Sequence, residues 1–178
     1  MFESRFEAGE ILSQKLLKIR GSLGRAGVKD ALILAIPRGG VVIGRIVSDA
    51  LGIPLGVVYA KKNPTPGQPE LAAGARIVRT KKFGKTPEVK DKSVILVDDG
   101  IATGATIEAA IGYLKKKEVG KITLAVPVAP KETVEKLKRM VDKLIILETP
   151  VYFGAVGEFY RDFPQVSDEE VVKLLKPS

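Results

Sequence analysis

Five short apolar runs separated by segments with helical periodicity constrain the fold of this chain more than any other feature. The runs span residues 31–36, 55–60, 94–97, 122–126 and 144–147. Their continuous hydrophobicity is typical of strands buried on both faces of a parallel sheet. Helical patterns at 41–51, 105–116 and 132–140 lie between these runs. The alternation predicts an α/β fold, in which a doubly wound parallel sheet is flanked by helices.

The two ends of the chain also carry helical signals. Apolar residues recur at helical spacing from Phe2 to about Leu23, and Gly21 and Gly24 are expected to end that helix. Near the other end, the sequence Ser-Asp-Glu-Glu at 167–170 is a capping box that predicts the start of a last helix.

Two segments interrupt the alternation. Residues 61–92 contain three prolines close to Gly67 and predict a mobile hairpin instead of a helical crossover, with its lid portion at about 61–80. Residues 150–166 are irregular and rich in aromatic side chains, so the stretch of about 148–178 is expected to form a small hood together with the N-terminal segment. Long irregular segments in a compact domain are often functional.

Length and composition set further limits. A chain of 178 residues fits one domain spanning 1–178, and the absence of Cys and His excludes thiolate zinc sites, cysteine nucleophiles and histidine-based triads. The formal charge of +8 favours anionic partners such as phosphorylated metabolites or nucleic acid. Because no apolar run approaches the roughly 18 residues of a membrane span and the first residues do not resemble a signal peptide, we expect a cytoplasmic protein without a membrane partner.

The strongest motif follows the third apolar run, where the buried segment 94–97 ends in Asp98 and Asp99. The next residues, Ile101, Ala102, Thr103, Gly104, Ala105 and Thr106, lead directly into a helical pattern. Ligands bind at this end of an open α/β sheet, and the free N–H groups at a helix start attract anions. The loop therefore predicts a phosphate site. Each half of the motif alone could be an ordinary helix cap or a tight turn, and their combination favours a functional site.

The role of the two carboxylates must be compatible with a negatively charged phosphate nearby. Asp98 and Asp99 would repel a phosphate if they pointed toward it, so they are expected to accept hydrogen bonds from sugar hydroxyls or to hold magnesium.

Residues 94–106 resemble the fingerprint of the type I phosphoribosyltransferases, which consists of four apolar residues, two acidic ones, a short link and Thr-Gly-x-Thr. The resemblance implies that residues 101–106 bind the 5-phosphate of phosphoribosyl pyrophosphate. It also implies that Asp98 and Asp99 bind the ribose hydroxyls, and Mg²⁺ through them or through water. The family fold is a parallel sheet flanked by helices, with a flexible loop and a hood over the site.

Two further segments resemble pyrophosphate-binding elements of that family. Arg38, Gly39 and Gly40 follow the first apolar run, where a basic residue and two small ones form the family's pyrophosphate loop. A guanidinium pairs with phosphate in a bidentate manner, and the two glycines expose backbone N–H groups. Lys61 at the end of the next run is a second pyrophosphate contact, so Asp98, Asp99, Arg38 and Lys61 form the expected catalytic set.

The base pocket is expected under the hood, where Tyr152, Phe153, Phe159 and Tyr160 offer stacking surfaces. The alternative is that these rings close the core, with the base recognised near Ala102 or by the lid around Glu70. Ala102 stands where hypoxanthine-guanine enzymes have Asp, which argues against a 6-oxopurine handled in their way.

The resemblance implies a Mg²⁺-dependent enzyme of nucleotide salvage that transfers the phosphoribosyl group from phosphoribosyl pyrophosphate to a purine or pyrimidine, as a homo-oligomer such as a dimer. The alternative is a non-catalytic sensor of phosphoribosyl pyrophosphate that binds RNA or DNA through the basic stretch 76–92. That stretch offers only Phe83 for stacking on a base, so a nucleic-acid partner is not expected. A pyrophosphokinase would need an ATP site, for which the sequence shows no candidate.

Overall fold

The computed structural model describes residues 1–22, 30–65, 68–78 and 81–177. Five parallel strands form the central sheet in the order β2-β1-β5-β6-β7. Their bounds are β1 Ala31–Ala35, β2 Leu55–Val57, β5 Ser93–Val97, β6 Lys121–Val128 and β7 Lys143–Glu148. The predicted doubly wound parallel sheet is confirmed, since the chain leaves β1 toward one edge and later returns through β5 to the other.

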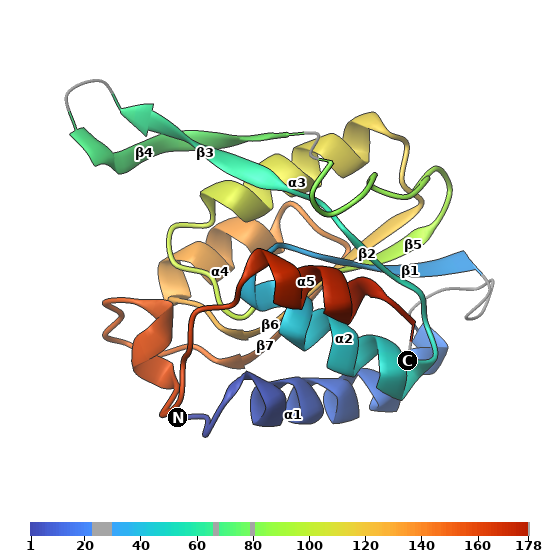
Figure 1. Cartoon of the computed structure of the whole chain (residues 1–178), viewed down its shortest axis with the longest axis horizontal. Coiled ribbons are helices and arrows are strands. Elements are labelled where there is room, and N and C mark those ends of the chain that lie inside the picture. The colour runs from blue at the N-terminus through green and yellow to red at the C-terminus, as the bar shows by residue number, and fades with distance from the viewer. Residues whose placement is uncertain (23–29, 66–67, 79–80, 178) are drawn as a thin grey trace.

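Helices cover both faces of the sheet (Figure 1). Their bounds are α1 Arg5–Lys18, α2 Gly39–Leu51, α3 Ala105–Lys116, α4 Lys131–Lys138 and α5 Asp168–Leu175, with short 3-10 turns at η1 Arg20–Ser22 and η3 Val156–Phe159. Alternate strand residues separate two cores: Ile33 and Val97 pack with α1 and α2, whereas Leu34 and Leu96 pack with α3 and α4. Strands buried on both faces explain the continuous apolar runs in the sequence.

The hairpin expected after the second apolar run is present. Strands β3 Ala60–Thr65 and β4 Gln68–Ile77 pair antiparallel and form a separate two-stranded sheet. In Figure 1 this hairpin extends from the body past α3, on the side where the parallel strands end. The predicted strand at 55–60 is split, because β2 stops at Val57 and the hairpin begins at Ala60. The tip residues 66–67 of the expected lid lie outside the described residues.

The N-terminal helix is shorter than the predicted span of 2–23. It begins at Arg5 behind the N-cap Ser4, whose side chain accepts a hydrogen bond from the Glu7 N–H, and it ends at Lys18. Phe2 instead pairs with the C-terminal segment, where its N–H donates to the Phe159 carbonyl at 2.8 Å. The predicted ending at Gly24 lies outside the described residues. The expected hood of N- and C-terminal segments is thus built by backbone pairing between them.

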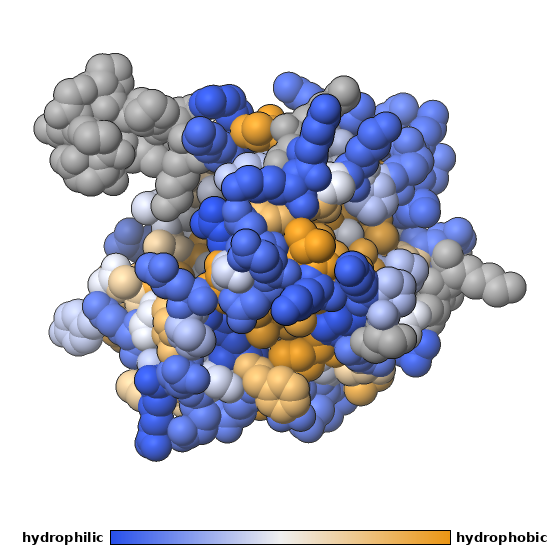
Figure 2. All heavy atoms as spheres, viewed as in Figure 1, coloured by the Kyte–Doolittle hydropathy of each residue, from blue (hydrophilic) through white to orange (hydrophobic). Residues whose placement is uncertain are grey.

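The last helix has the predicted capping box: the Ser167 side chain accepts from the Glu170 N–H, and the Glu170 carboxylate accepts from the Ser167 N–H. Figure 2 shows the face that carries α1, α2 and α5 covered mainly by hydrophilic residues, with small apolar patches between them. Within the described part of the chain, no helix has the length and apolar character needed to cross a membrane.

Candidate active site

The acidic pair lies at the carboxyl end of β5, beside the loop that follows β1. These two strands are parallel neighbours, with Ala35 in register with Val97. The Ile36 N–H donates to the Val97 carbonyl at 3.0 Å, which extends the pairing toward the site. Adjacency of β1 and β5 therefore brings the Arg38 loop against Asp98 and Asp99, although about 60 residues separate them in the sequence.

Gly39 and Gly40 permit this close approach. A Cβ at Gly39 would lie 1.9 Å from an oxygen of the Asp99 carboxylate, and one at Gly40 would lie 2.8 Å from Asp98 Oδ1. Any side chain at either position would collide with the acidic pair. The packing of this loop against the acidic pair thus requires glycine at both positions. The peptide bond that precedes Arg38 is cis.

Asp99 makes a contact that sequence reasoning missed. The Arg5 side chain on α1 donates from Nε to Asp99 Oδ2 at 2.7 Å and from Nη1 to the Pro164 carbonyl at 2.7 Å. Its guanidinium carbon also lies 3.7 Å from the centroid of the Phe163 ring. Arg5 and Asp99 have side-chain exposures of 9% and 14%, so one carboxylate of the predicted ribose-binding pair is already held by a nearly buried cation.

The other carboxylate has a different environment. Asp98 accepts a hydrogen bond from the Asp99 N–H at 2.8 Å. Burial raises the pKa of Asp98 well above its ordinary value, the adjacent Asp99 charge raises it further, and the Arg5 charge opposes both effects. A hydroxyl donor or a cation beside Asp98 would relieve this unfavourable burial of charge.

The phosphate loop is anchored by β6 and α4. The Ile101 N–H donates to the Val128 carbonyl at 2.9 Å, and the Thr133 hydroxyl donates to the Ala102 carbonyl at 2.8 Å. Gly104 caps α3 with a φ of 86°, a left-handed conformation that favours glycine. Ala102 and Thr103 are exposed, while Ala105 and Thr106 are half-buried in the first turn of the helix. The loop thus lies at the carboxyl end of the sheet, where the Thr103 hydroxyl oxygen accepts a hydrogen bond from the Ala105 N–H at 3.5 Å.

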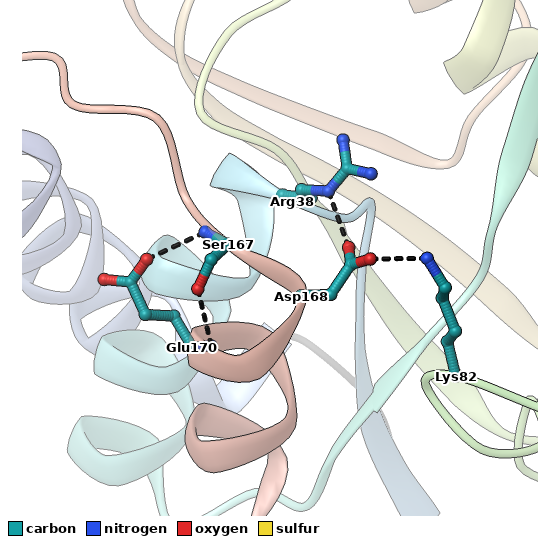
Figure 3. A network of polar contacts seen from close by, with 5 residues as sticks. All are labelled: Arg38, Lys82, Ser167, Asp168 and Glu170. Carbon is teal, nitrogen blue, oxygen red and sulfur yellow. Dashed lines mark hydrogen bonds and ion pairs between the residues drawn. The ribbon is translucent and has the colours of Figure 1, made fainter.

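Arg38 has an acidic partner from the C-terminal helix. Figure 3 shows the Asp168 carboxylate between two cations, with Oδ1 accepting from Arg38 Nε at 2.7 Å and Oδ2 accepting from Lys82 Nζ at 2.6 Å. Hydrogen bonds from Lys82 and Arg38 lower the pKa of Asp168. From the sequence, Lys82 is indistinguishable from a plain surface charge, and the capping box gives no sign that its Asp168 contacts the site.

A cavity of about 520 Å³ opens between the Arg38 loop and the start of α5. Arg5, Arg38, Gly39 and residues 165–168 line it. Both arginines of this lining already pair with a carboxylate, Arg5 with Asp99 and Arg38 with Asp168, so an anionic group in the cavity would compete with Asp168 for Arg38. Lys61 lies elsewhere: it is exposed at the start of the hairpin, in register with Arg76. Glu70 is in β4.

The four aromatic residues of the hood differ in exposure. Tyr160 is 5% exposed, its ring packs against Phe2 and Phe163 with centroids 5.5 and 5.0 Å away, and its hydroxyl donates to the Asp99 carbonyl. Burial raises the pKa of the Tyr160 hydroxyl, and the nearby Asp99 charge adds to this effect. Tyr160 therefore has a structural role in this conformation.

The other three rings are more accessible. Phe153 and Phe159 stack on each other at 5.1 Å and are partly buried, whereas Tyr152 is 89% exposed. Next to them, Gly100 is pressed against the hood, since a Cβ there would lie 2.5 Å from Val156 Cγ1. The hood is thus seated directly on the end of β5.

Residues 6–160 match the family model of the phosphoribosyl transferase domain. The chain belongs to this family, which confirms the resemblance derived from residues 94–106. A relative from Mycobacterium tuberculosis, described as a candidate phosphoribosyl transferase, is 32% identical over 212 residues, covering 98% of this chain and 46% of that protein. The chain thus spans about half the length of this curated relative.

Solved structures agree with the fold. The crystal structure of the protein TT1426 from Thermus thermophilus has a TM-score of 0.79 and 32% identity, with 98% of this chain and 97% of that chain covered. A purine phosphoribosyltransferase from Pyrococcus horikoshii has a TM-score of 0.56 at 24% identity, with 90% of each chain covered. The type I phosphoribosyltransferase fold predicted from the sequence is therefore confirmed.

Proposed function

We propose that this protein transfers the 5-phosphoribosyl group of phosphoribosyl pyrophosphate to a ring nitrogen of a nucleobase. The observation that carries the proposal is the meeting of three elements at neighbouring strand ends. These are the phosphate loop 101–106, the acidic pair after β5, and the Arg38 loop after β1. Their donors and acceptors match a sugar that carries a phosphate at one end and a pyrophosphate at the other.

Each part of the substrate has an assigned place. The 5-phosphate lies on the loop N–H groups and the hydroxyls of Thr103 and Thr106, where the α3 dipole favours an anion. The ribose hydroxyls donate to Asp98 and Asp99. The pyrophosphate lies in the cavity by Arg38, with Gly39 and Gly40 offering N–H groups and Lys61 approaching when the hairpin closes.

In the reaction, the bond between C1 and the pyrophosphate oxygen breaks, and a bond between C1 and the base nitrogen forms. Pyrophosphate leaves with the bonding electrons, and the nitrogen loses its proton to solvent. Positive charge grows on the sugar ring while negative charge grows on the pyrophosphate. The acidic pair at the ribose and Arg38 at the leaving group are the groups that would stabilise these charges.

Magnesium fits this site as a substrate-bound ion. In the described part of the chain no cluster of three or more acidic or other metal-binding side chains is present, and Asp99 Oδ2 is occupied by Arg5. Mg²⁺ retains several waters and is commonly held by one or two carboxylates together with substrate phosphates. Asp98 and Asp99 would reach it through ribose hydroxyls or water, and the ion would supply charge neutralisation at the pyrophosphate.

The same proposal includes the cellular setting and the partners: a cytoplasmic homo-oligomer of one domain acting in nucleotide salvage. A nucleic-acid partner is not favoured, because the basic stretch after the hairpin is partly engaged within the protein. Lys82 contacts Asp168, and Lys90 Nζ lies 3.3 Å from a Glu118 carboxylate oxygen.

The test is pyrophosphate release from phosphoribosyl pyrophosphate and Mg²⁺ with a panel of purines and pyrimidines. We expect turnover with at least one base, and its loss in Asp98→Asn, which keeps the ion pair between Arg5 and Asp99. The control is Glu132→Gln with Glu135→Gln, which removes two exposed carboxylates from α4. Absence of turnover with every base, combined with salt-dependent binding of RNA or DNA, would support the sensor instead.

A further inference from the structure

A second cavity, of about 770 Å³, lies apart from the candidate active site. Its walls are the end of β2 and the base of the hairpin, residues 81 and 84–89, and the end of α3 with Tyr113 and the C-cap Lys117. Among the residues that the structure describes, it shares no lining residue with the cavity at Arg38. Lys117 follows Gly104 by 13 positions along α3, and a rise of about 1.5 Å per residue places it roughly 20 Å from the phosphate loop.

The lining combines an apolar wall with aromatic rings. Val57 and Val89 are buried, Ile77 and Val78 are half-buried, and all four face this cavity. Two partly buried tyrosines, Tyr59 and Tyr113, add ring surface. Tyr59 is fixed from behind by Phe83, whose ring meets it edge-on with centroids 5.7 Å apart. A preformed aromatic and apolar surface of this kind suits a flat, unsaturated ring.

The charged residues of the same lining select an anion. Lys81, Lys85 and Lys117 are exposed there, and Glu88 is the acidic residue among the described part of the lining. Lys117 Nζ lies 5.8 Å from the centroid of the Tyr113 ring, so a cation and a ring face the same space. The Glu88 carboxylate accepts a hydrogen bond from the Lys90 N–H at 3.1 Å, which partly satisfies its charge. An anionic group held among these lysines would lie next to the ring surface.

We propose that this cavity binds a free mononucleotide, with its base against the tyrosines and the apolar wall and its phosphate among the lysines. Small-molecule sites have volumes of roughly 300–1000 Å³, so the cavity is of the size for one nucleotide and not for a strand. Lys82 and Lys90 each pair with a carboxylate of the protein. These ion pairs interrupt the row of basic side chains that a nucleic-acid strand would follow along this segment.

Nucleotide bound here would act on the hairpin. The Val78 N–H donates to the Tyr59 carbonyl at 2.8 Å, and this bond joins the two ends of the hairpin where they leave the body. Both residues line the cavity. An effect of the bound nucleotide on closure of the hairpin over the substrate rests on the proposed function. Binding of a nucleotide in this cavity does not depend on that function.

The experiment is photoaffinity labelling of the protein with 8-azido-AMP and 8-azido-GMP, followed by mass spectrometry of the labelled peptides. We expect saturable labelling of peptides containing Tyr59 or Tyr113. Lys117→Gln and Tyr113→Leu should each raise the half-saturating concentration at least fivefold. Lys116→Gln is the matched control, because this exposed lysine precedes Lys117 on α3 and does not line the cavity.

Labelling only in 98–106 or 150–163 would overturn the proposal, because it would place the nucleotide at the candidate active site. Equal half-saturation in Lys117→Gln and Lys116→Gln, or labelling that does not saturate, would overturn it as well. Where Tyr113→Leu lowers thermal stability, Lys85→Gln takes its place. Pyrophosphate release is measured separately, so failure of the transferase proposal and failure of this site are distinguishable.

Discussion

Replacing Arg5 with Met tests the contact that links α1 to the acidic pair. The substitution keeps a long apolar side chain and removes the guanidinium. Three interactions are lost together: the ion pair to Asp99 at 2.7 Å, the hydrogen bond to the Pro164 carbonyl at 2.7 Å, and the contact with the Phe163 ring. Because Asp99 is only 14% exposed, its charge would remain in the protein without a partner.

The expected loss of stability is large. Breaking a buried pair by removing one partner costs about 3 to 5 kcal/mol, since the remaining charge is left uncompensated. The free energy of unfolding of a natural domain is only about 5 to 15 kcal/mol. At about 2 to 4 °C per kcal/mol for a chain of this size, the melting temperature should fall by roughly 6 to 20 °C. The pKa of Asp98 should rise further, because Arg5 at present opposes that rise.

The assay is urea and thermal unfolding followed by circular dichroism, with Arg161→Met as the control. Arg161 pairs with Glu3 at 3.1 Å, but the two side chains are 68% and 60% exposed, so its loss should cost no more than about 1 kcal/mol. Combination with Asp99→Asn completes a double-mutant cycle, in which Arg5→Met should cost at least about 1 kcal/mol less than it does alone. The buried-pair reasoning would be refuted if Arg5→Met and Arg161→Met lowered the free energy of unfolding equally. It would also be refuted if Arg5→Met lowered that free energy by the same amount in the Asp99→Asn background as in the wild type.

Four other predictions concern residues of the candidate active site and its surroundings. Asp168→Asn should strengthen pyrophosphate binding in calorimetry, because it frees Arg38 from a competing carboxylate; Glu169→Gln, one residue along the same helix turn, should leave binding unchanged. Because the pKa of Asp168 is lowered, its ion pairs with Arg38 and Lys82 should be complete at pH values above the ordinary carboxyl range. These ion pairs should be lost as the pH falls through the lowered pKa. Unfolding measured across this pH range at low and high salt can follow the loss. Gly39→Ala should abolish pyrophosphate release, because the new Cβ would overlap the Asp99 carboxylate, and retained activity would contradict the role of that glycine. Tyr160→Phe should lower the free energy of unfolding by about 1 to 3 kcal/mol, as the Asp99 carbonyl loses its hydroxyl donor, and an unchanged urea midpoint would contradict it.

The fold and the strand-loop-helix at 94–106 could be predicted from the sequence because both depend on local patterns. Continuous apolar runs mark strands buried on both faces, and the Asp98–Thr106 motif joins a strand end to a helix start within one short segment. The capping box at Ser167 is likewise complete within four residues. In each case the residues that form the feature are close together in the chain, so their spacing already determines their geometry.

The side-chain partners of Asp99 and of Arg38 were decided by the tertiary structure alone. Arg5 reaches Asp99 across 94 positions, and Asp168 reaches Arg38 across 130. No local pattern marks which arginine will be buried or which carboxylate will meet it, because this depends on how α1 and α5 pack over the sheet ends. The same holds for Tyr160: the sequence left both base stacking and core packing open for its ring, and the pairing of Phe2 with Tyr160 placed it inside.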